Sequence, residues 1–260
     1  MVDKKKIGLT LSGGGARGFG HLGVIRALEE NGIKPNIISG TSSGAMVATF
    51  YAAGYSVDNI IRIARKTGFF ALKNMQFGKA GIFNMKALEN LILEHIPGDN
   101  FESLKIPIYV CATNVIESKP IYFSSGVLSK AVMASSCIPM IYEPVKINNT
   151  FYLDGGLTDN FPVSIIRDKC DLLIGSYVNH LSTKLEHLHL KDMMDRSFHM
   201  ALSSSITEKS ALCDLFIAPN DMSRFGMFDT SKINEIVDFA YHFTLDILKN
   251  TQFLSKTTSK

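Results

Sequence analysis

The sequence predicts an α/β fold built on a mainly parallel sheet. Two short apolar runs, residues 7–11 and 36–39, each end in a glycine-rich turn, and a segment with helical spacing follows each turn. Such alternation of strand and helix is typical of parallel sheets, because a crossover helix must return the chain to the start of the next strand. Both turns then lie at the carboxyl ends of neighbouring strands.

The other elements follow from periodicity and from helix stop signals. Leu22, Ile25 and Leu28 recur at helical spacing over residues 20–31, and Gly32 provides the stop. A buried helix is predicted over 45–53, closed by Gly54. The same arguments predict helices over 56–66, 85–96, 128–135, much of 188–212 and the apolar stripe of 233–248, and strands over 107–112, 150–153, 171–178 and 215–218.

Composition and charge exclude several classes of protein. The net charge of +3 is too small to indicate a nucleic-acid partner. The four cysteines lie far apart without metal-ligand spacing, so we interpret them as free thiols in a reducing compartment: Cys111, Cys137, Cys170 and Cys213. The first apolar run is too short for a signal peptide, and no window offers the ~18 uncharged apolar residues of a spanning helix. We expect a cytoplasmic protein without a metal or another cofactor.

The first turn, Gly13-Gly14-Gly15-Ala16-Arg17-Gly18, presents flexible backbone N–H groups at the start of a helix. Such groups hold anions. The pattern also matches the fingerprint of a dinucleotide site, which requires an acidic residue at the end of the second strand. That strand ends without a carboxylate, so the turn favours an oxyanion or another small anion. Arg17 either adds charge to this cradle or is a surface arginine.

The second turn, Gly40-Thr41-Ser42-Ser43-Gly44, has the G-x-S-x-G pattern of a nucleophile elbow. The two glycines let other backbone approach a serine at a sharp turn from strand to helix. Because the serine precedes a helix, the helix dipole favours a developing negative charge beside it. Ser43 is a competing hydroxyl, but the glycine spacing centres the elbow on Ser42. The two turns together predict a serine hydrolase.

A serine nucleophile requires a base, and the sequence offers two kinds. Among the histidines, His180 follows a predicted strand and is the best triad candidate, whereas His21 precedes the serine. The remaining histidines after the elbow are His95, His187, His189, His199 and His242. Asp154 ends a short predicted strand before two glycines, although spacing alone favours a turn aspartate.

Four segments together resemble the patatin-like phospholipase family in order and spacing: the two turns, Ala-Ser-Ser-Cys-Ile-Pro at 134–139, and Asp-Gly-Gly-Leu-Thr-Asp-Asn-Phe-Pro at 154–162. The resemblance covers residues 7 to about 218 and implies a three-layer α/β/α sandwich. It also implies a Ser-Asp dyad without histidine, with Ser42 as nucleophile and Asp154 as base. The implied oxyanion hole is Gly13, Gly14 and Gly15, supported by Arg17, Gly18, Gly40, Gly44, Gly155 and Gly156.

From the resemblance we expect a catalytic domain over residues 5–220 and a C-terminal helical extension over 221–260 packed on it. The implied function is a lipid acyl hydrolase of the phospholipase A, lysophospholipase or carboxylesterase type. Two alternatives use the same fold: an acyltransferase with the same dyad, or a regulatory protein with little turnover. Cys137-Ile138 departs from the small residues that relatives often carry there, without touching a catalytic position.

Residues 68–85 interrupt the predicted alternation of strands and helices. The segment has three glycines and no clear period, and its large apolar residues lie among Lys73 and Lys79: Phe69, Phe70, Met75, Phe77 and Phe83. We expect a lid or acyl groove that contacts lipid at a membrane surface, with lysines meeting head groups. The alternative is a set of core aromatics on an irregular loop.

Overall fold

A computed structural model describes residues 5–67, 76–77, 83–180, 200, 206–227, 229–251 and 253. The strands are β1 (Ile7–Leu11), β2 (Ile37–Thr41), β3 (Gln76–Phe77), β4 (Phe83–Asn84), β5 (Ile108–Asn114), β6 (Lys119–Phe123), β7 (Val145–Ile147), β8 (Thr150–Asp154), β9 (Leu172–Ser176) and β10 (Leu215–Ile217). The α-helices are α1 (Gly20–Glu30), α2 (Ser43–Ala52), α3 (Val57–Thr67), α4 (Lys86–His95), α5 (Leu128–Ser135), α6 (Gly156–Asp159), α7 (Ser164–Arg167), α9 (Ile206–Ser210) and α10 (Ile233–Asn250). Short 3₁₀ helices include η1 (Gly15–Phe19).

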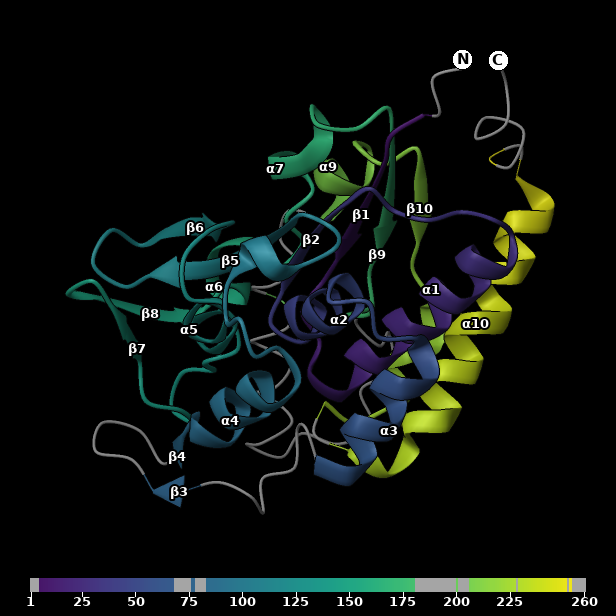
Figure 1. Cartoon of the computed structure of the whole chain (residues 1–260). Helices are drawn as coiled ribbons and strands as arrows, with labels where there is room; N and C mark the ends of the chain where they lie inside the picture. Colours follow the sequence, from purple (N-terminus) through teal and green to yellow (C-terminus); the bar gives the residue numbers. More distant parts are fainter. Residues whose placement is uncertain are drawn as a thin grey trace.

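The described strands form an eight-stranded central sheet and a separate two-stranded hairpin (Figure 1). The order of the large sheet is β10-β9-β1-β2-β5-β8-β7, and β6 also pairs with β5. The run from β10 to β5 is parallel, whereas β6, β7 and β8 are antiparallel to their neighbours. This confirms the predicted parallel sheet and adds an antiparallel half to it.

Helices cover both faces of the sheet, because the strands are apolar on both sides. Alternate residues of β1, such as Leu9 and Leu11, join a large core beneath α1, α2, α3, α4, α5 and α10. Leu173 of β9 faces the other way and packs with Phe161 and Ile166, on the side of α7. Strands buried on both faces read as continuous apolar runs. The architecture is therefore a sheet between two helical layers.

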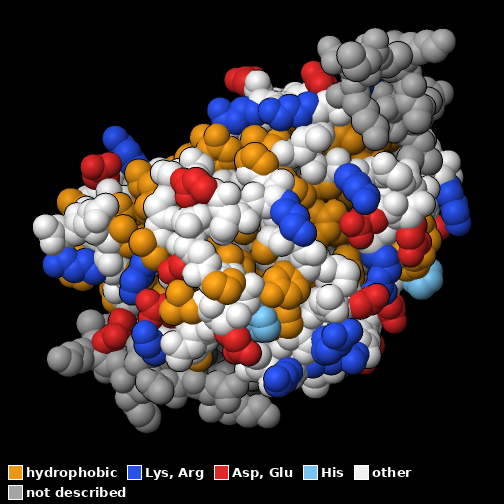
Figure 2. Space-filling view, in the orientation of Figure 1, with side chains coloured by type: hydrophobic (Ala, Val, Ile, Leu, Met, Phe, Trp, Pro, Cys, Tyr) orange, Lys and Arg blue, Asp and Glu red, His pale blue; other side chains and the backbone are white. Residues whose placement is uncertain are grey.

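The predicted C-terminal stripe forms α10, which lies along α1 (Figure 1). Ile236, Val237 and Ala240 on its inner face are buried. At the outer edge of this contact, the Tyr241 hydroxyl donates to a Glu30 carboxylate oxygen at 2.6 Å. Among the described helices, none is both long and apolar enough to cross a lipid bilayer. In the view of Figure 2, acidic and basic side chains are interspersed around apolar areas.

Several elements differ from the prediction. The second part of the glycine turn forms a 3₁₀ helix, η1, that leads into α1, and β6 has no counterpart among the predicted strands. Within 68–85, β3 and β4 pair as a short antiparallel hairpin, whereas Phe69 and Phe70 lie outside the described residues. Most of the predicted helix over 188–212 also lies outside them, and its described end is α9.

Candidate active site

The sheet brings the ends of β2 and β8 together on one edge of β5. Thr41, the last residue of β2, pairs with Cys111 of β5, and Asp154, the last residue of β8, pairs with the next residue, Ala112. Because β6 pairs with both Cys111 and Ala112, it occupies the other edge of β5. The antiparallel β8 therefore points its carboxyl end at the carboxyl end of β2. This register places Asp154 beside Ser42.

Ser42 forms the predicted elbow between β2 and α2. Its backbone has φ 52° and ψ −120°, a conformation that costs a non-glycine residue roughly 1–3 kcal/mol. The turn is held because the Ser42 N–H donates to Ser135 Oγ at 2.8 Å and its carbonyl accepts from Met46 N–H at 3.0 Å. Gly44 is needed here, since a Cβ would collide with the Leu11 and Ser12 carbonyls. The surrounding structure therefore imposes a strained backbone, which fixes the direction of the Ser42 hydroxyl.

The partner of the Ser42 hydroxyl is the Asp154 carboxylate. The Ser42 side chain interacts with this carboxylate and favours its charged form, and the Gly156 N–H donates to Asp154 Oδ1 at 2.7 Å. Burial raises the pKa of Asp154 to about 6, and these two interactions oppose this rise only in part. A carboxylate with such a pKa is ionised at neutral pH and is a better proton acceptor than an exposed aspartate.

The end of α5 and the residues after it support both members of this pair. The Ser135 hydroxyl accepts from the Ser42 N–H, and the Ser135 carbonyl accepts from the Gly155 N–H at 3.3 Å. The Cys137 carbonyl accepts from the Asp154 N–H at 2.9 Å. In the sequence, residues 134–139 indicate only the family resemblance, and their pattern does not predict the contact of Ser135 with the Ser42 N–H. Its signal was a hydroxyl at the end of a helix, shortly before a proline.

The departure at Cys137 leaves the pair untouched. Its thiol is buried and donates to the Glu143 carbonyl at 2.6 Å. Burial, with a further contribution from the Asp154 charge, raises the pKa of the Cys137 thiol to about 12. The sulfur is therefore protonated and is no competing nucleophile.

The glycine turn lies beside Ser42 but offers fewer amides than predicted. The Gly13 N–H donates to the Asn160 carbonyl at 3.1 Å, so it is already engaged. Within the described part of the chain, no acceptor contacts the amides of Gly14 or Gly15. Gly15 has φ +56°, and a Cβ there would strike the Met227 backbone. The candidate oxyanion donors are thus Gly14 and Gly15, and Gly13 instead fixes the turn.

Arg17 is buried, so its interpretation as a surface arginine is wrong. Its Nε donates to the Phe225 carbonyl at 2.8 Å, and its backbone N–H donates to the Gly14 carbonyl at 3.2 Å. Arg17 therefore ties the glycine turn to the segment before α10. The other glycines that the resemblance names lie in the two glycine-rich turns and directly after Asp154: Gly18, Gly40, Gly44, Gly155 and Gly156.

The described histidines do not contact the Ser42–Asp154 pair. His21 is fully buried; its Nε2 donates to the Ser12 carbonyl and its Nδ1 accepts from the Ser176 hydroxyl, both at 2.8 Å. Burial lowers the pKa of His21 to about 4, so it is a neutral structural group. His180 packs edge-to-face on Tyr177. His95 and His242 bond elsewhere, and His187, His189 and His199 lie outside the described residues.

Replacing His21 by alanine is expected to lower stability without removing chemistry. The folded pKa lies below the unfolded one, so the stabilisation by His21 is present above about pH 6.5 and is lost as the pH falls towards 4. The difference in unfolding free energy between wild type and His21→Ala should therefore shrink over that range. Urea melts at several pH values measure it. Loss of esterase activity per folded molecule at pH 8 would instead assign His21 to the reaction.

Comparison with known proteins identifies the family of the chain. Residues 9–166 match the family described as patatin-like phospholipase. Uncharacterized protein R571 of Acanthamoeba polyphaga mimivirus is 34% identical over 268 residues, which cover 95% of this chain and 89% of the viral one. Lysophospholipase NTE1 of Kluyveromyces lactis is 26% identical over 284 residues, which cover 96% of this chain. This chain spans only a fifth of the yeast protein's length.

A solved structure supports the fold independently. VipD from Legionella pneumophila superposes with a TM-score of 0.54 at 15% identity, over 95% of this chain and 67% of VipD. At that identity the likeness concerns the arrangement of helices and strands alone. The family match, by contrast, spans both turns and the Asp154 segment. This chain belongs to the patatin-like phospholipase family.

Proposed function

We propose that this protein is a lipid acyl hydrolase that uses Ser42 and Asp154 as a catalytic dyad. The observation that carries the proposal is the placement of Ser42, on a strained backbone at the start of α2, beside the buried Asp154 carboxylate with which its side chain interacts. Strain of this kind persists where the surrounding structure imposes it, and it is concentrated at functional sites.

The dyad supplies both proton transfers of acyl transfer. Asp154 accepts the Ser42 proton as Oγ attacks the ester carbonyl, and the amides of Gly14 and Gly15 stabilise the tetrahedral oxyanion. Asp154 then gives the proton to the leaving alcohol, which departs and leaves an acyl-serine. In the second half, Asp154 accepts a proton from the attacking water and returns it to Ser42 Oγ as the fatty acid is released.

The substrate class that we propose is a phospholipid or lysophospholipid ester. The family description and the yeast relative named a lysophospholipase support it. An acyltransferase would use the same residues with an alcohol in place of water. The intact contact between Ser42 and Asp154 favours turnover over a purely regulatory role.

A lipid panel tests the proposal. The purified chain is incubated with phosphatidylcholine, lysophosphatidylcholine and a soluble p-nitrophenyl ester, and released fatty acid is measured. We expect release from at least one glycerolipid, together with labelling by a fluorophosphonate. Labelling without fatty-acid release, but with formation of a new ester once an acceptor alcohol is added, would indicate an acyltransferase, and neither signal would favour the regulatory alternative.

We also propose that 68–85 contacts lipid at a membrane surface. The pattern of Phe69, Phe70, Lys73 and Lys79 carries this proposal, and these residues lie outside the described ones. Each phenylalanine that enters the acyl boundary contributes ~1.5–3 kcal/mol. Replacing Phe69 and Phe70 by serine should abolish activity on long-chain vesicles, while the melting temperature and the hydrolysis of soluble esters persist. A sharp drop in melting temperature with equal loss on all substrates would identify core aromatics.

A further inference from the structure

An ion pair with a buried carboxylate and a partly buried ammonium lies on the segment that follows Asp154. Lys209 Nζ of α9 donates to Asp159 Oδ1 at 2.6 Å, and the two side chains are 18% and 6% exposed. The Tyr122 hydroxyl of β6 donates to the other carboxylate oxygen at 2.6 Å. The Phe161 N–H adds a bond to Oδ1 at 3.2 Å. Asp159 is thereby held from two elements distant in the sequence.

The backbone around Asp159 contacts the other two parts of the candidate site. Its own carbonyl accepts from Thr41 Oγ1 at 2.8 Å, and Thr41 immediately precedes Ser42. The next carbonyl, of Asn160, accepts from the Gly13 N–H at 3.1 Å. One segment of seven residues, 154–160, therefore carries the base, braces the nucleophile strand and fixes the glycine turn.

We infer that Lys209 is a positioning residue for the reaction proposed above: its ion pair with Asp159 sets the segment 154–160 so that base, nucleophile and oxyanion donors keep one geometry. The family match ends at residue 166, so Lys209 reaches into the matched motif from beyond it. A buried charged group with two such partners has one favourable arrangement, because any other leaves a charge without compensation. A displacement of about 1 Å in such a site costs on the order of 10²-fold in rate.

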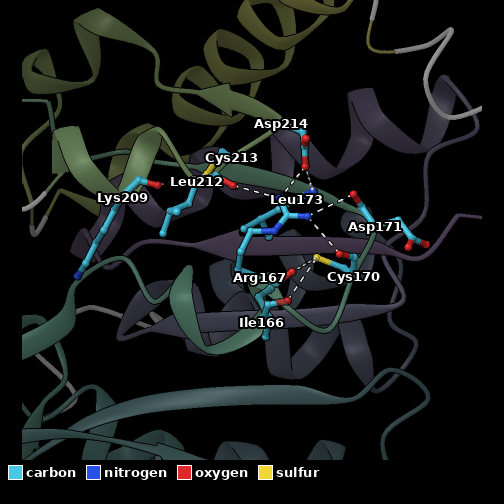
Figure 3. Close-up of polar contacts among 9 residues, drawn as sticks. All are labelled: Ile166, Arg167, Cys170, Asp171, Leu173, Lys209, Leu212, Cys213 and Asp214. Carbon is cyan, nitrogen blue, oxygen red and sulfur yellow. Dashed lines mark hydrogen bonds and ion pairs between the residues drawn. The ribbon is translucent and has the colours of Figure 1, made fainter.

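A second ion pair in the same region provides a matched control. Arg167 NH1 donates to Asp214 at 2.7 Å and to the Leu212 carbonyl at 3.1 Å. Its NH2 donates to the Cys170 and Asp171 carbonyls. Like Lys209, it anchors the chain around α9 and β10, but the Lys209 side chain points away from this cluster (Figure 3). Arg167→Met therefore removes a comparable anchor without touching Asp159.

The test compares Lys209→Met with Arg167→Met in the full chain. Hydrolysis of a soluble ester is measured per active site counted with a fluorophosphonate, together with the phosphonylation rate of Ser42 and the melting temperature. We expect Lys209→Met to lower kcat and the phosphonylation rate by roughly 10–100-fold with little change in KM. Arg167→Met should lower the melting temperature but keep both rates per active site, and Lys209→Arg should recover part of the loss.

A double variant separates positioning from the effect of a stranded charge. Asp159→Asn with Lys209→Met removes both charges, so it is expected to fold even where the single variant does not. If the ion pair sets the geometry, the double variant is as slow as Lys209→Met. Wild-type rates in the double variant, or equal rate losses in Lys209→Met and Arg167→Met, would overturn the inference. A wild-type chain that neither hydrolyses esters nor reacts with phosphonate would refute the proposed function instead.

Discussion

Replacing Ser42 by alanine is expected to lower ester hydrolysis by roughly 10⁶-fold, as removal of the nucleophile does in serine proteases. The variant loses the hydroxyl that interacts with the Asp154 carboxylate. Fluorophosphonate labelling should disappear with it. Mass mapping of the labelled wild type should find a single adduct, on Ser42.

Two further substitutions make this result specific. Ser43 Oγ is buried and lacks a hydrogen-bond partner in the described structure, packed against Gly18, so Ser43→Ala should keep labelling and activity. Ser42→Gly should be as inactive as Ser42→Ala but more stable, because glycine adopts φ 52° without the strain that alanine retains. An adduct on Ser43, or hydrolysis by Ser42→Gly at the wild-type rate, would place the nucleophile elsewhere.

The parts of the fold that the sequence predicted are those that local patterns determine. The strand over 7–11 and the helix over 128–135 have the predicted bounds. At the hairpin between β7 and β8, Asn148 and Asn149 take φ of +47° and +67°, as a two-residue turn that suits asparagine requires. In each case a period of 2 or 3.6 and a stop signal lie within a few residues of each other.

The features that were missed depend on contacts between distant segments. β6 is half-buried and carries Lys119 and Pro120, so its sequence lacks the apolar run of a core strand. In the sequence Arg17 looks like a surface residue, but in the structure its side chain donates to the carbonyl of Phe225, more than 200 positions later. Likewise, the Gly13 amide of the glycine turn is engaged because it donates to the carbonyl of Asn160, which lies far along the chain. Motif spacing cannot reveal such partners.

The choice between histidine and aspartate as base shows the same limit. Spacing alone favours a turn aspartate at position 154, and only the family resemblance implies the role of a base. The structure adds the physical reason: β5 pairs with β2 and then with β8 along one edge, which brings the two carboxyl ends together. The residue pattern of a single strand does not reveal with which other strand it pairs.

The ionisation of Asp154 should appear in the rate of the wild type. Because the base must be ionised to accept the Ser42 proton, kcat/KM on a soluble ester should rise with pH through an apparent pKa of about 6. His21 titrates below that range in the folded state, at a pKa of about 4, and does not contact the pair.

Replacing Asp154 by asparagine should separate activity from stability. Without an ionisable base, kcat should fall by about 10⁴-fold, as it does when the aspartate of a serine-protease triad is changed. The folded pKa of Asp154, about 6, lies above the unfolded one, so the fold loses stability as the pH rises from about 4, and the loss is complete above about pH 6. At pH 8, Asp154→Asn should therefore be more stable, by on the order of 3 kcal/mol.

The pH dependence of that stability gain identifies its cause. The unfolded chain ionises Asp154 at a lower pH than the folded chain does, so the advantage of Asp154→Asn is fully present above about pH 6 and should shrink as the pH falls from 6 to 4. His21 acts with the opposite sign over the same range and offsets Asp154 in the wild type. The variant should consequently lose stability more steeply than the wild type on acidification, as urea melts at pH 8, 6 and 4 can measure. An Asp154→Asn protein that is less stable at pH 8 would mean that the interactions of Asp154 with Ser42 and Gly156 compensate the buried charge in full.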